Sequence, residues 1–399
     1  MTRRRVAPQF DGLRCGRLLS MAPGRPVIDD GCVLIDRATQ TVAAVGRYRD
    51  LVADLDGACK DLGAHTVAPG LVNCHTHLEL SHMRGRLPQG QGFEAWVKQM
   101  LALPLGNIES EFLAQTLADC RAQGTAFVAD ITSRRPLDVA AACGQAGLEF
   151  LLFGEPLGFG RDGAGPPDIW PAPVAALAPS FIEAHVAAAG HGLYSTHPAT
   201  LQAGKAWDRA RNRPYSIHLA EHVGEVELLA TGRGSFAELL RGRILPKEFA
   251  APSLSPVAYA DKLGLLDERT LAVHCVHVDN ADIALLHARG VNVCLCPRSN
   301  LYIGVGRAPV EKFWAAGLNL CLATDSLASN QDLDLWNELR FFLENSATRC
   351  TLAEALALVT VNPAQALGID TAFGTLEPGK RAAVSIVPPN LAPFDPANT

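Results

Sequence analysis

The sequence lacks any apolar run of the roughly 18 to 20 residues that a membrane-spanning helix requires. After the opening MTRRR, it also lacks the apolar segment and cleavage site of a signal peptide. Positive charge is scarce as well, because 35 Lys and Arg residues stand against 41 Asp and Glu residues, for a net charge of −6. A basic surface for nucleic acid is therefore not expected. These absences predict a cytoplasmic protein without a membrane or nucleic-acid partner.

Paired cysteines are missing too, although cysteine itself is not rare. The 11 cysteines are an odd number and are scattered over the whole chain. The closest two, Cys294 and Cys296, have the spacing that puts two side chains on one face of a strand. This pattern argues against a disulfide framework and against a cysteine-rich zinc site. We expect reduced, mostly buried thiols.

The 399 residues, 48% hydrophobic and only 19% charged, are enough for one large α/β barrel or two ordinary domains. Up to about residue 66, short alternating segments such as GCVLIDRATQTVAAVG predict antiparallel strands. From Thr66 onward, strand-like apolar runs are each followed by an Ala- and Leu-rich segment of helical period. That alternation is typical of repeated β-α units.

Eight such runs occur, namely HTVAPGLVNCHTH, GTAFVADIT, LEFLLFGEPLG, HGLYSTHPA, YSIHLAE, TLAVHCVHV, VNVCLCPRSN and LNLCLATDS. Eight parallel strands predict a closed (β/α)8 TIM barrel, which we assign to residues 67–370. The tail TAFGTLEPGKRAAVSIV has a Pro-Gly turn between two strand-like pieces. We expect residues 371–399 to complete a small β-sandwich that residues 1–66 begin.

Polar residues end several of these runs, and in a barrel of this kind the chemistry lies at the C-terminal ends of the strands. They are His75 and His77 on strand one, His197 on strand four, His218 and Glu221 on strand five, His274 on strand six and Asp325 on strand eight. His75 and His77 alone are compatible with two hydrogen-bonded core histidines. Their spacing on a strand also points both side chains the same way, and with His218 and Asp325 they form a ligand set suited to Zn²⁺ or Fe²⁺.

Several longer motifs agree with these positions: PGLVNCHTHLELS, HLAEHVGEVE, VHCVHVD, CPRSN, TDSLASN, VNPAQALGI and GTLEPGKRA, spread over residues 69–382. With them the chain resembles the amidohydrolase superfamily, in particular its cytosine deaminase and chlorohydrolase-like branch. The resemblance implies one metal ion, most often zinc, on His75, His77, His218 and Asp325. It implies Glu221 and His274 as further catalytic groups. Members with two metals carry a bridging lysine after strand four, and the segment LYSTHPAT has none.

These residues suggest a reaction. A divalent metal lowers the pKa of its water to about 7 and so supplies hydroxide. Asp325 would accept the proton of that water, Glu221 would protonate a ring nitrogen, and His274 would stabilise the developing charge. The His-X-X-Glu spacing of His218 and Glu221 favours deamination in a cyclic amidine over simple amide hydrolysis. A chlorohydrolase-like hydrolase of an N-heterocycle and an inactive scaffold are the alternatives.

The motifs HTHLELS, CPRSN and TDSLASN look most like those of the aminodeoxyfutalosine deaminases, which act on an adenine nucleoside in menaquinone biosynthesis. That resemblance implies that Arg298 binds the benzoate carboxylate of this substrate; a surface arginine is the alternative. Trp96 is expected either in the core or as a lid over the substrate. His197, as a ribose contact, and Glu79 complete the candidate substrate-binding residues.

Two departures keep a methylthioadenosine/adenosylhomocysteine-type deaminase as an alternative. Those enzymes carry a ribose-binding Glu in the loop after strand one, and WVKQMLALPLGNIE has no counterpart. Many relatives also have the order His-Ala-Pro-Tyr after strand four, where we read THPAT. The expected partner is a small-molecule substrate. A homodimer is compatible with the sequence, which does not define the oligomeric state.

Overall fold

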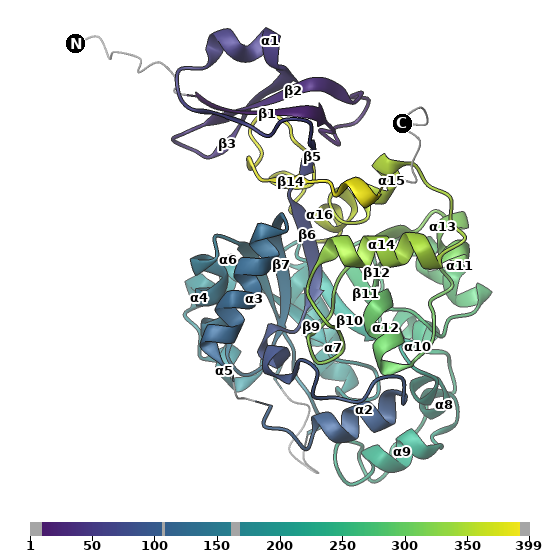
Figure 1. The fold of residues 1–399 in the computed structure, drawn as a ribbon. Helices are drawn as coiled ribbons and strands as arrows, with labels where there is room; N and C mark the ends of the chain where they lie inside the picture. Colours follow the sequence, from purple (N-terminus) through teal and green to yellow (C-terminus); the bar gives the residue numbers. More distant parts are fainter. Residues whose placement is uncertain (1–9, 106–107, 161–167, 392–399) are drawn as a thin grey trace.

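The computed structural model describes residues 10–105, 108–160 and 168–391, which form a barrel and a smaller sheet (Figure 1). The barrel strands are all parallel and follow each other in chain order: β6 (Leu71–Thr76), β7 (Thr125–Thr132), β8 (Glu149–Gly154), β9 (Val186–Gly190), β10 (Tyr215–Leu219), β11 (Thr270–His274), β12 (Asn292–Leu295) and β13 (Asn319–Leu322). The predicted α/β barrel is thereby confirmed.

Side chains join the first strand to the last. The Asn73 amide donates to Thr324 Oγ1 at 2.8 Å, and the Thr324 N–H donates to Asn73 Oδ1 at 3.3 Å. The Asp325 N–H donates to the His75 carbonyl at 3.2 Å. These bonds bring the C-terminal end of β6 against the loop after β13, so polar residues distant in sequence share one end of the barrel.

Helices cover the outside of the barrel, which explains why its strands read as continuous apolar runs. All eight residues of β7 and all six of β6 are buried. Helix α1 (Tyr48–Leu51) lies apart from these, on the small sheet (Figure 1). The other α-helices are α2 (Phe93–Met100), α3 (Ser110–Ala122), α4 (Pro136–Gln145), α5 (Ala172–Ala175), α6 (Pro179–His185), α7 (Pro198–Arg209), α8 (Val223–Thr231), α9 (Ser235–Leu240), α10 (Pro256–Lys262), α11 (Asn280–Ala288), α12 (Pro297–Ile303), α13 (Val310–Ala315), α14 (Leu335–Asn345), α15 (Leu352–Ala357) and α16 (Val361–Ala366). Among the described residues, no helix is long and apolar enough to cross a membrane.

The smaller sheet takes strands from both ends of the chain: β1 (Phe10–Leu18), β2 (Ile28–Asp36), β3 (Thr41–Arg47), β4 (Cys59–Asp61), β5 (Thr66–Pro69) and β14 (Val384–Ile386). Their order is β14-β5-β1-β2-β3, with β4 beside β1. The C-terminal segment also reaches the opposite edge, because Val42 exchanges backbone hydrogen bonds of 2.8 Å with Gly379 and Lys380. In its described residues the expected small domain is thus one sheet, curled around a core that includes Leu18 and Val67.

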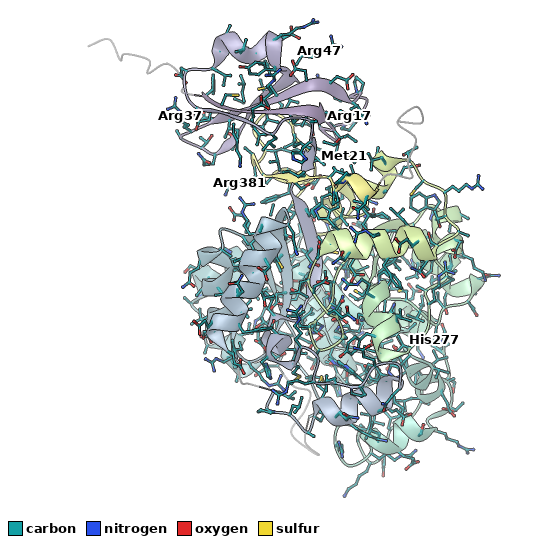
Figure 2. All side chains as sticks on the ribbon, viewed as in Figure 1. Arg17, Met21, Arg37, Arg47, His277 and Arg381 are labelled. Atoms are coloured by element: carbon teal, nitrogen blue, oxygen red, sulfur yellow. The ribbon has the colours of Figure 1, made fainter. Side chains whose placement is uncertain are left out.

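Gly70 forms the junction between the two parts. A Cβ at this position would lie 2.6 Å from the Ala126 Cβ and 2.9 Å from the Ala383 Cβ, so a side chain would not fit. An ion pair of 2.6 Å between Arg381 and Glu149 adds a second link. Arg381 lies between the small sheet and the barrel (Figure 2). The small sheet lies at one end of the barrel, and α2, α8 and α9 lie at the other (Figure 1). The division at residues 66 and 370 stays a prediction.

One strand was placed wrongly from the sequence. We expected strand four in HGLYSTHPA, but β9 is the preceding segment VAAAG, which follows α6 directly. Three alanines carry little strand preference, and they hide the strand behind a helical run. The first residue after β9 is therefore His191, while His197 is the N-cap residue that precedes the next helix, α7.

Candidate active site

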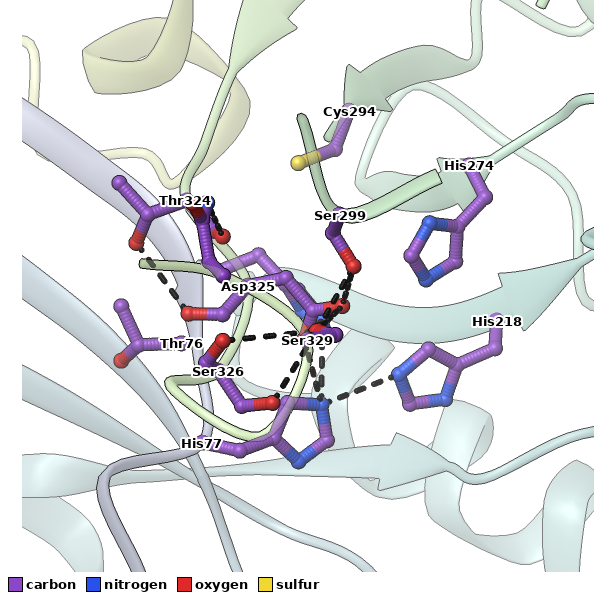
Figure 3. A network of polar contacts seen from close by, with 12 residues as sticks. Thr76, His77, His218, His274, Cys294, Ser299, Thr324, Asp325, Ser326 and Ser329 are labelled. Atoms are coloured by element: carbon purple, nitrogen blue, oxygen red, sulfur yellow. Dashed lines mark hydrogen bonds and ion pairs between the residues drawn. The ribbon is translucent and has the colours of Figure 1, made fainter. Parts of the chain in front are cut away.

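Four side chains from three strand ends meet at the barrel mouth. His77 Nε2 lies 3.2 Å from His75 Nε2 and 3.3 Å from His218 Nε2 (Figure 3). Asp325 Oδ1 lies 3.7 Å from His75 Nε2 and 3.6 Å from His77 Nε2. Ligand atoms around a tetrahedral zinc with bonds of 2.0 to 2.1 Å are separated by about 3.3 Å. The ligand atoms of the three histidines lie within 4.8 Å of one another and could hold one ion, and Asp325 stays the expected fourth ligand.

The histidines are held in the form that binds a metal. Burial is the main cause that lowers the pKa of His77 to about 3 and also lowers the pKa values of His75 and His218. All three rings are neutral near pH 7, which is the ligating state. His218 Nδ1 donates to the His191 carbonyl at 2.7 Å, so its Nε2 lone pair faces the other ligands.

Asp325 is oriented by two hydroxyl groups. Ser299 Oγ and Ser329 Oγ donate to its Oδ2 at 2.6 and 3.0 Å, which leaves Oδ1 facing the histidines (Figure 3). Burial alone would raise the pKa of Asp325, but the nearby histidines and the Ser299 hydrogen bond lower it overall. The side chain is therefore a carboxylate at neutral pH.

The backbone at this mouth is strained. Ala220 after β10, His274 and Cys275 at the end of β11, and Asp325 after β13 have φ between +47° and +74°. Residues with a Cβ rarely adopt these angles, which cost about 1 to 3 kcal/mol each. Strain repeated on three strand ends marks a functional site, because it turns the side chains of His274 and Asp325 to the same mouth.

Glu221 and His274 lie beside the ligand set, with 3.7 Å between Glu221 Oε1 and His274 Nε2. Burial, and then the charges of Asp325 and Glu225, raise the pKa of Glu221 well above its usual value. This shift favours the protonated form of Glu221. His274 Nδ1 lies 2.9 Å from Asn300 Oδ1, and burial lowers the pKa of His274 to about 4.

Three polar residues near this set were not predicted from the sequence, namely Glu155, His191 and Glu225. The ligand atoms of Glu155, His191 and His218 lie within 4.8 Å of one another. Glu155 and His191 directly follow β8 and β9, and the order His-Gly-Leu-Tyr from His191 was the available signal. Glu225, in α8, is buried, and its Oε2 accepts the Glu221 N–H at 2.9 Å.

A cavity of about 480 Å³ opens above the ligand set. Its floor contains His77, His218, Glu221, His274 and Asp325. Its walls are mostly apolar and include Leu80, Phe93, Trp96, Met100, Leu239 and Ile303, while Arg134 and Arg243 add positive charge. An apolar pocket with a few convergent polar groups is the usual form of a small-molecule site.

Two predicted substrate-binding residues line this cavity. Trp96 is 8% exposed and donates from Nε1 to the Ala328 carbonyl at 3.0 Å. It is therefore a core residue that also lines the cavity. Glu79 uses Oε1 to accept the Thr132 hydroxyl at 2.6 Å and the backbone N–H groups of residues 133–135. Glu79 therefore fixes the loop after β7.

The structure corrects the expected placement of the other two. Arg298 forms a bidentate ion pair with Asp332 at 2.6 and 3.0 Å and has Glu338 at 3.5 Å. His197 accepts the Ala199 N–H at 3.1 Å and caps α7. Neither is among the described residues that line the cavity. Each of these side chains has a partner within the chain instead.

The fold and the site define a metal-dependent hydrolase built on a (β/α)8 barrel. Residues 66–398 match the sequence model of the Amidohydrolase family, and the chain belongs to that family. A 5-methylthioadenosine/S-adenosylhomocysteine deaminase of Moorella thermoacetica is 30% identical over 92% of this chain and 84% of the relative. One from Halobacterium salinarum is 31% identical over 92% and 82%.

Solved structures share the fold. An adenosine deaminase from Xanthomonas campestris with bound zinc is 26% identical, with a TM-score of 0.77 over 94% of this chain and 84% of that chain. The aminofutalosine deaminase of Helicobacter pylori, in complex with methylthio-coformycin, has a TM-score of 0.80 over 94% and 91%, at 21% identity. At that identity the second comparison shows the fold alone.

Proposed function

We propose that the protein is a metal-dependent aminohydrolase that removes the 6-amino group of an adenine nucleoside. The observation that carries this proposal is Glu221, a buried carboxyl group that lies beside the ligand set, 3.7 Å from His274, and whose pKa is raised by burial. A ring nitrogen must gain a proton before an amine can leave an aromatic ring, and a protonated carboxyl group supplies it. The deaminase names of the relatives support the same reaction.

His75, His77, His218 and Asp325 would hold the metal. Three neutral imidazoles and one carboxylate suit Zn²⁺ first and Fe²⁺ as the alternative. When bound, the ion would make hydroxide available at neutral pH, because it lowers the pKa of water to about 7.

The residues of the chain divide the remaining work. Ser299 and Ser329 hold Asp325 so that Oδ1, an ionised acceptor, can take a proton inside the cavity. Glu221 donates its proton to the ring. His274, with Nδ1 held by Asn300, presents Nε2 toward Glu221 and the reacting atoms, where it can orient an O–H group.

For the substrate we propose an adenine nucleoside whose sugar substituent carries a carboxylate. The first candidate is 6-amino-6-deoxyfutalosine, which would place the enzyme in menaquinone biosynthesis. The support is the cavity itself, where apolar walls are combined with the guanidinium groups of Arg134 and Arg243. These two arginines replace Arg298 as candidate carboxylate partners, because Arg298 is engaged with Asp332.

A methylthioadenosine/adenosylhomocysteine deaminase is the second candidate, favoured by the relatives at 30% and 31% identity. A spectrophotometric assay can separate the candidates, since loss of the 6-amino group shifts the ultraviolet absorbance. Zinc-loaded protein should be given aminodeoxyfutalosine, adenosylhomocysteine and methylthioadenosine in parallel. The highest kcat/KM is expected for aminodeoxyfutalosine. Turnover of methylthioadenosine alone would retire the carboxylate substrate, and turnover of none would contradict the deaminase proposal.

A further inference from the structure

Glu155 is a buried acid that neither the ligand set nor the proposed proton transfers use. It directly follows β8, its side chain is 5% exposed, and it lines the cavity. Within the described part of the chain, its Oε1 has no hydrogen-bond partner. Buried polar atoms are nearly always paired, because an unpaired one loses its interaction with water without compensation. A ligand in the cavity can supply that partner, because Glu155 lines the cavity.

The backbone holds Glu155 in place for such a contact. The Glu155 N–H donates to the Thr132 carbonyl at 3.1 Å, and Ser133 Oγ donates to the Glu155 carbonyl at 3.1 Å. Both bonds connect it to the loop after β7, which Glu79 fixes in turn. The side chain thus projects from a supported strand end rather than from a free loop.

Glu155 has no established task toward its neighbours. Its Oε1 lies 3.6 Å from His218 Nδ1, beyond a good hydrogen bond, and that nitrogen already donates to the His191 carbonyl at 2.7 Å. The other acid on this side, Glu79, has Oε1 saturated by donors of the β7 loop. Glu155 is therefore the acid with an unused acceptor atom on the β8 side of the cavity.

We infer that Glu155 is a specificity-determining residue that binds a hydroxyl group of the substrate sugar. The inference rests on the proposed function. The ring nitrogens N1, N3 and N7 of adenine only accept hydrogen bonds, so the donors of an adenine nucleoside are its 6-amino group and its sugar hydroxyls. The 6-amino group must lie at the ligand set and Glu221 to be removed. Burial raises the pKa of Glu155 to about 8, but one oxygen of a carboxyl group accepts hydrogen bonds whether or not the group is protonated. An acceptor elsewhere in the cavity is left with the hydroxyls.

The test compares substrates with and without one hydroxyl. Adenosine, 2′-deoxyadenosine and 3′-deoxyadenosine should be assayed with wild-type protein, Glu155→Leu and Glu155→Gln, with metal content measured for each. Wild-type kcat/KM should favour adenosine over at least one deoxynucleoside by about 10-fold to 100-fold. Glu155→Leu should reduce that ratio to near one with its metal retained. Glu155→Gln should keep part of it, because the amide oxygen still accepts a hydrogen bond.

A matched control lies on the same strand. Glu149, at the other end of β8, is half exposed and pairs with Arg381, so Glu149→Gln should keep the wild-type ratio. An equal loss on adenosine and both deoxynucleosides in Glu155→Leu would assign Glu155 a structural role and overturn the inference. 3-Deazaadenosine, which lacks the N3 acceptor, is assayed as well. If Glu155→Leu changes only the ratio of kcat/KM between adenosine and 3-deazaadenosine, the inference is also overturned, because Glu155 would then donate to N3. A metal-loaded wild type that deaminates no adenine nucleoside would overturn the proposed function and this inference together.

Discussion

The two sides of the barrel mouth are built differently. On the side of β6, β10, β11 and β13, neighbouring side chains hold two of the polar groups, Asp325 through Ser299 and His274 through Asn300. On the side of β8 and β9, Glu155 Oε1 has no hydrogen-bond partner among the described residues, and His191 Nδ1 lies 2.5 Å from Ser195 Oγ. The first arrangement is expected of groups that perform chemistry, because catalysis needs fixed geometry. The second is expected of groups whose partner is the substrate.

The largest expected effect comes from removing a ligand on the first side. His75→Ala should leave the protein without its metal and with no measurable turnover of any substrate, because three ligands would remain where four are spaced for one ion. Metal analysis of purified protein, with about one equivalent expected in wild type, checks this. His287→Ala, an exposed histidine on α11, serves as the control. Full activity of metal-free wild-type protein would show that the residues of this side do not act through a metal, and it would contradict the contrast between the two sides of the mouth.

Glu221→Gln should separate metal binding from proton transfer. The variant should keep its metal but lose ~10²- to 10⁴-fold in kcat, the usual contribution of a general acid. The loss should be similar for every adenine nucleoside, since the protonated ring is common to all. The exposed Glu227→Gln on the following helix is the matched control. Activity within a few-fold of wild type would mean that another group protonates the ring.

Arg134→Met and Arg243→Met address recognition of the carboxylate. Each should reduce kcat/KM for aminodeoxyfutalosine by roughly 10-fold to 100-fold, because a charge-assisted hydrogen bond contributes about 1.5 to 3 kcal/mol. Methylthioadenosine, which has no carboxylate, should be nearly unaffected. Arg135→Met, at the exposed neighbour that pairs with Asp138, should change neither substrate. Equal losses of kcat/KM on both substrates would show that the arginines support the structure of the barrel mouth and do not bind the carboxylate.

The smallest effect concerns Glu225 and stability. Burial raises the pKa of Glu225 from 4.5 to about 8, so the folded protein holds this proton more tightly than the unfolded chain does. The resulting stabilisation is complete below pH 4.5 and is lost as the pH rises to about 8. Glu225→Gln does not titrate. Its melting temperature should therefore fall less than that of wild type between about pH 6 and about pH 9, measured in parallel scans. If the melting temperatures of Glu225→Gln and wild type change with pH by the same amount, Glu225 is not protonated in the folded protein.

The side of the mouth formed by β6, β10, β11 and β13 was predictable because its residues stand out in the sequence. His75, His77, His218, His274 and Asp325 each interrupt or end a strongly apolar run, and a parallel barrel brings such ends together. The fold followed from the same runs, since strands covered on both faces read as continuous apolar segments.

The residues that would contact the substrate were less predictable from the sequence. His191 was missed because its strand, VAAAG, has no β-branched residue beyond Val186, and the neighbouring His197 was taken in its place. Arg298 was assigned to the substrate because its true partner, Asp332, lies 34 positions further along the chain. Pairing across such a distance depends on tertiary packing, which no local pattern records.

The curled small sheet has a consequence for the order of events during synthesis. Strands β1 to β5 are made first, but the segment that pairs with both β5 and β3 is made last. At 5 to 20 residues per second, the early strands would wait roughly 15 to 60 s on the ribosome with two unpaired edges. The barrel would form in that interval, and the last strand would then close the sheet over an already folded body. Nascent chains stalled before Val384 should accordingly bind chaperones through their N-terminal strands, and release should follow once β14 has left the ribosome.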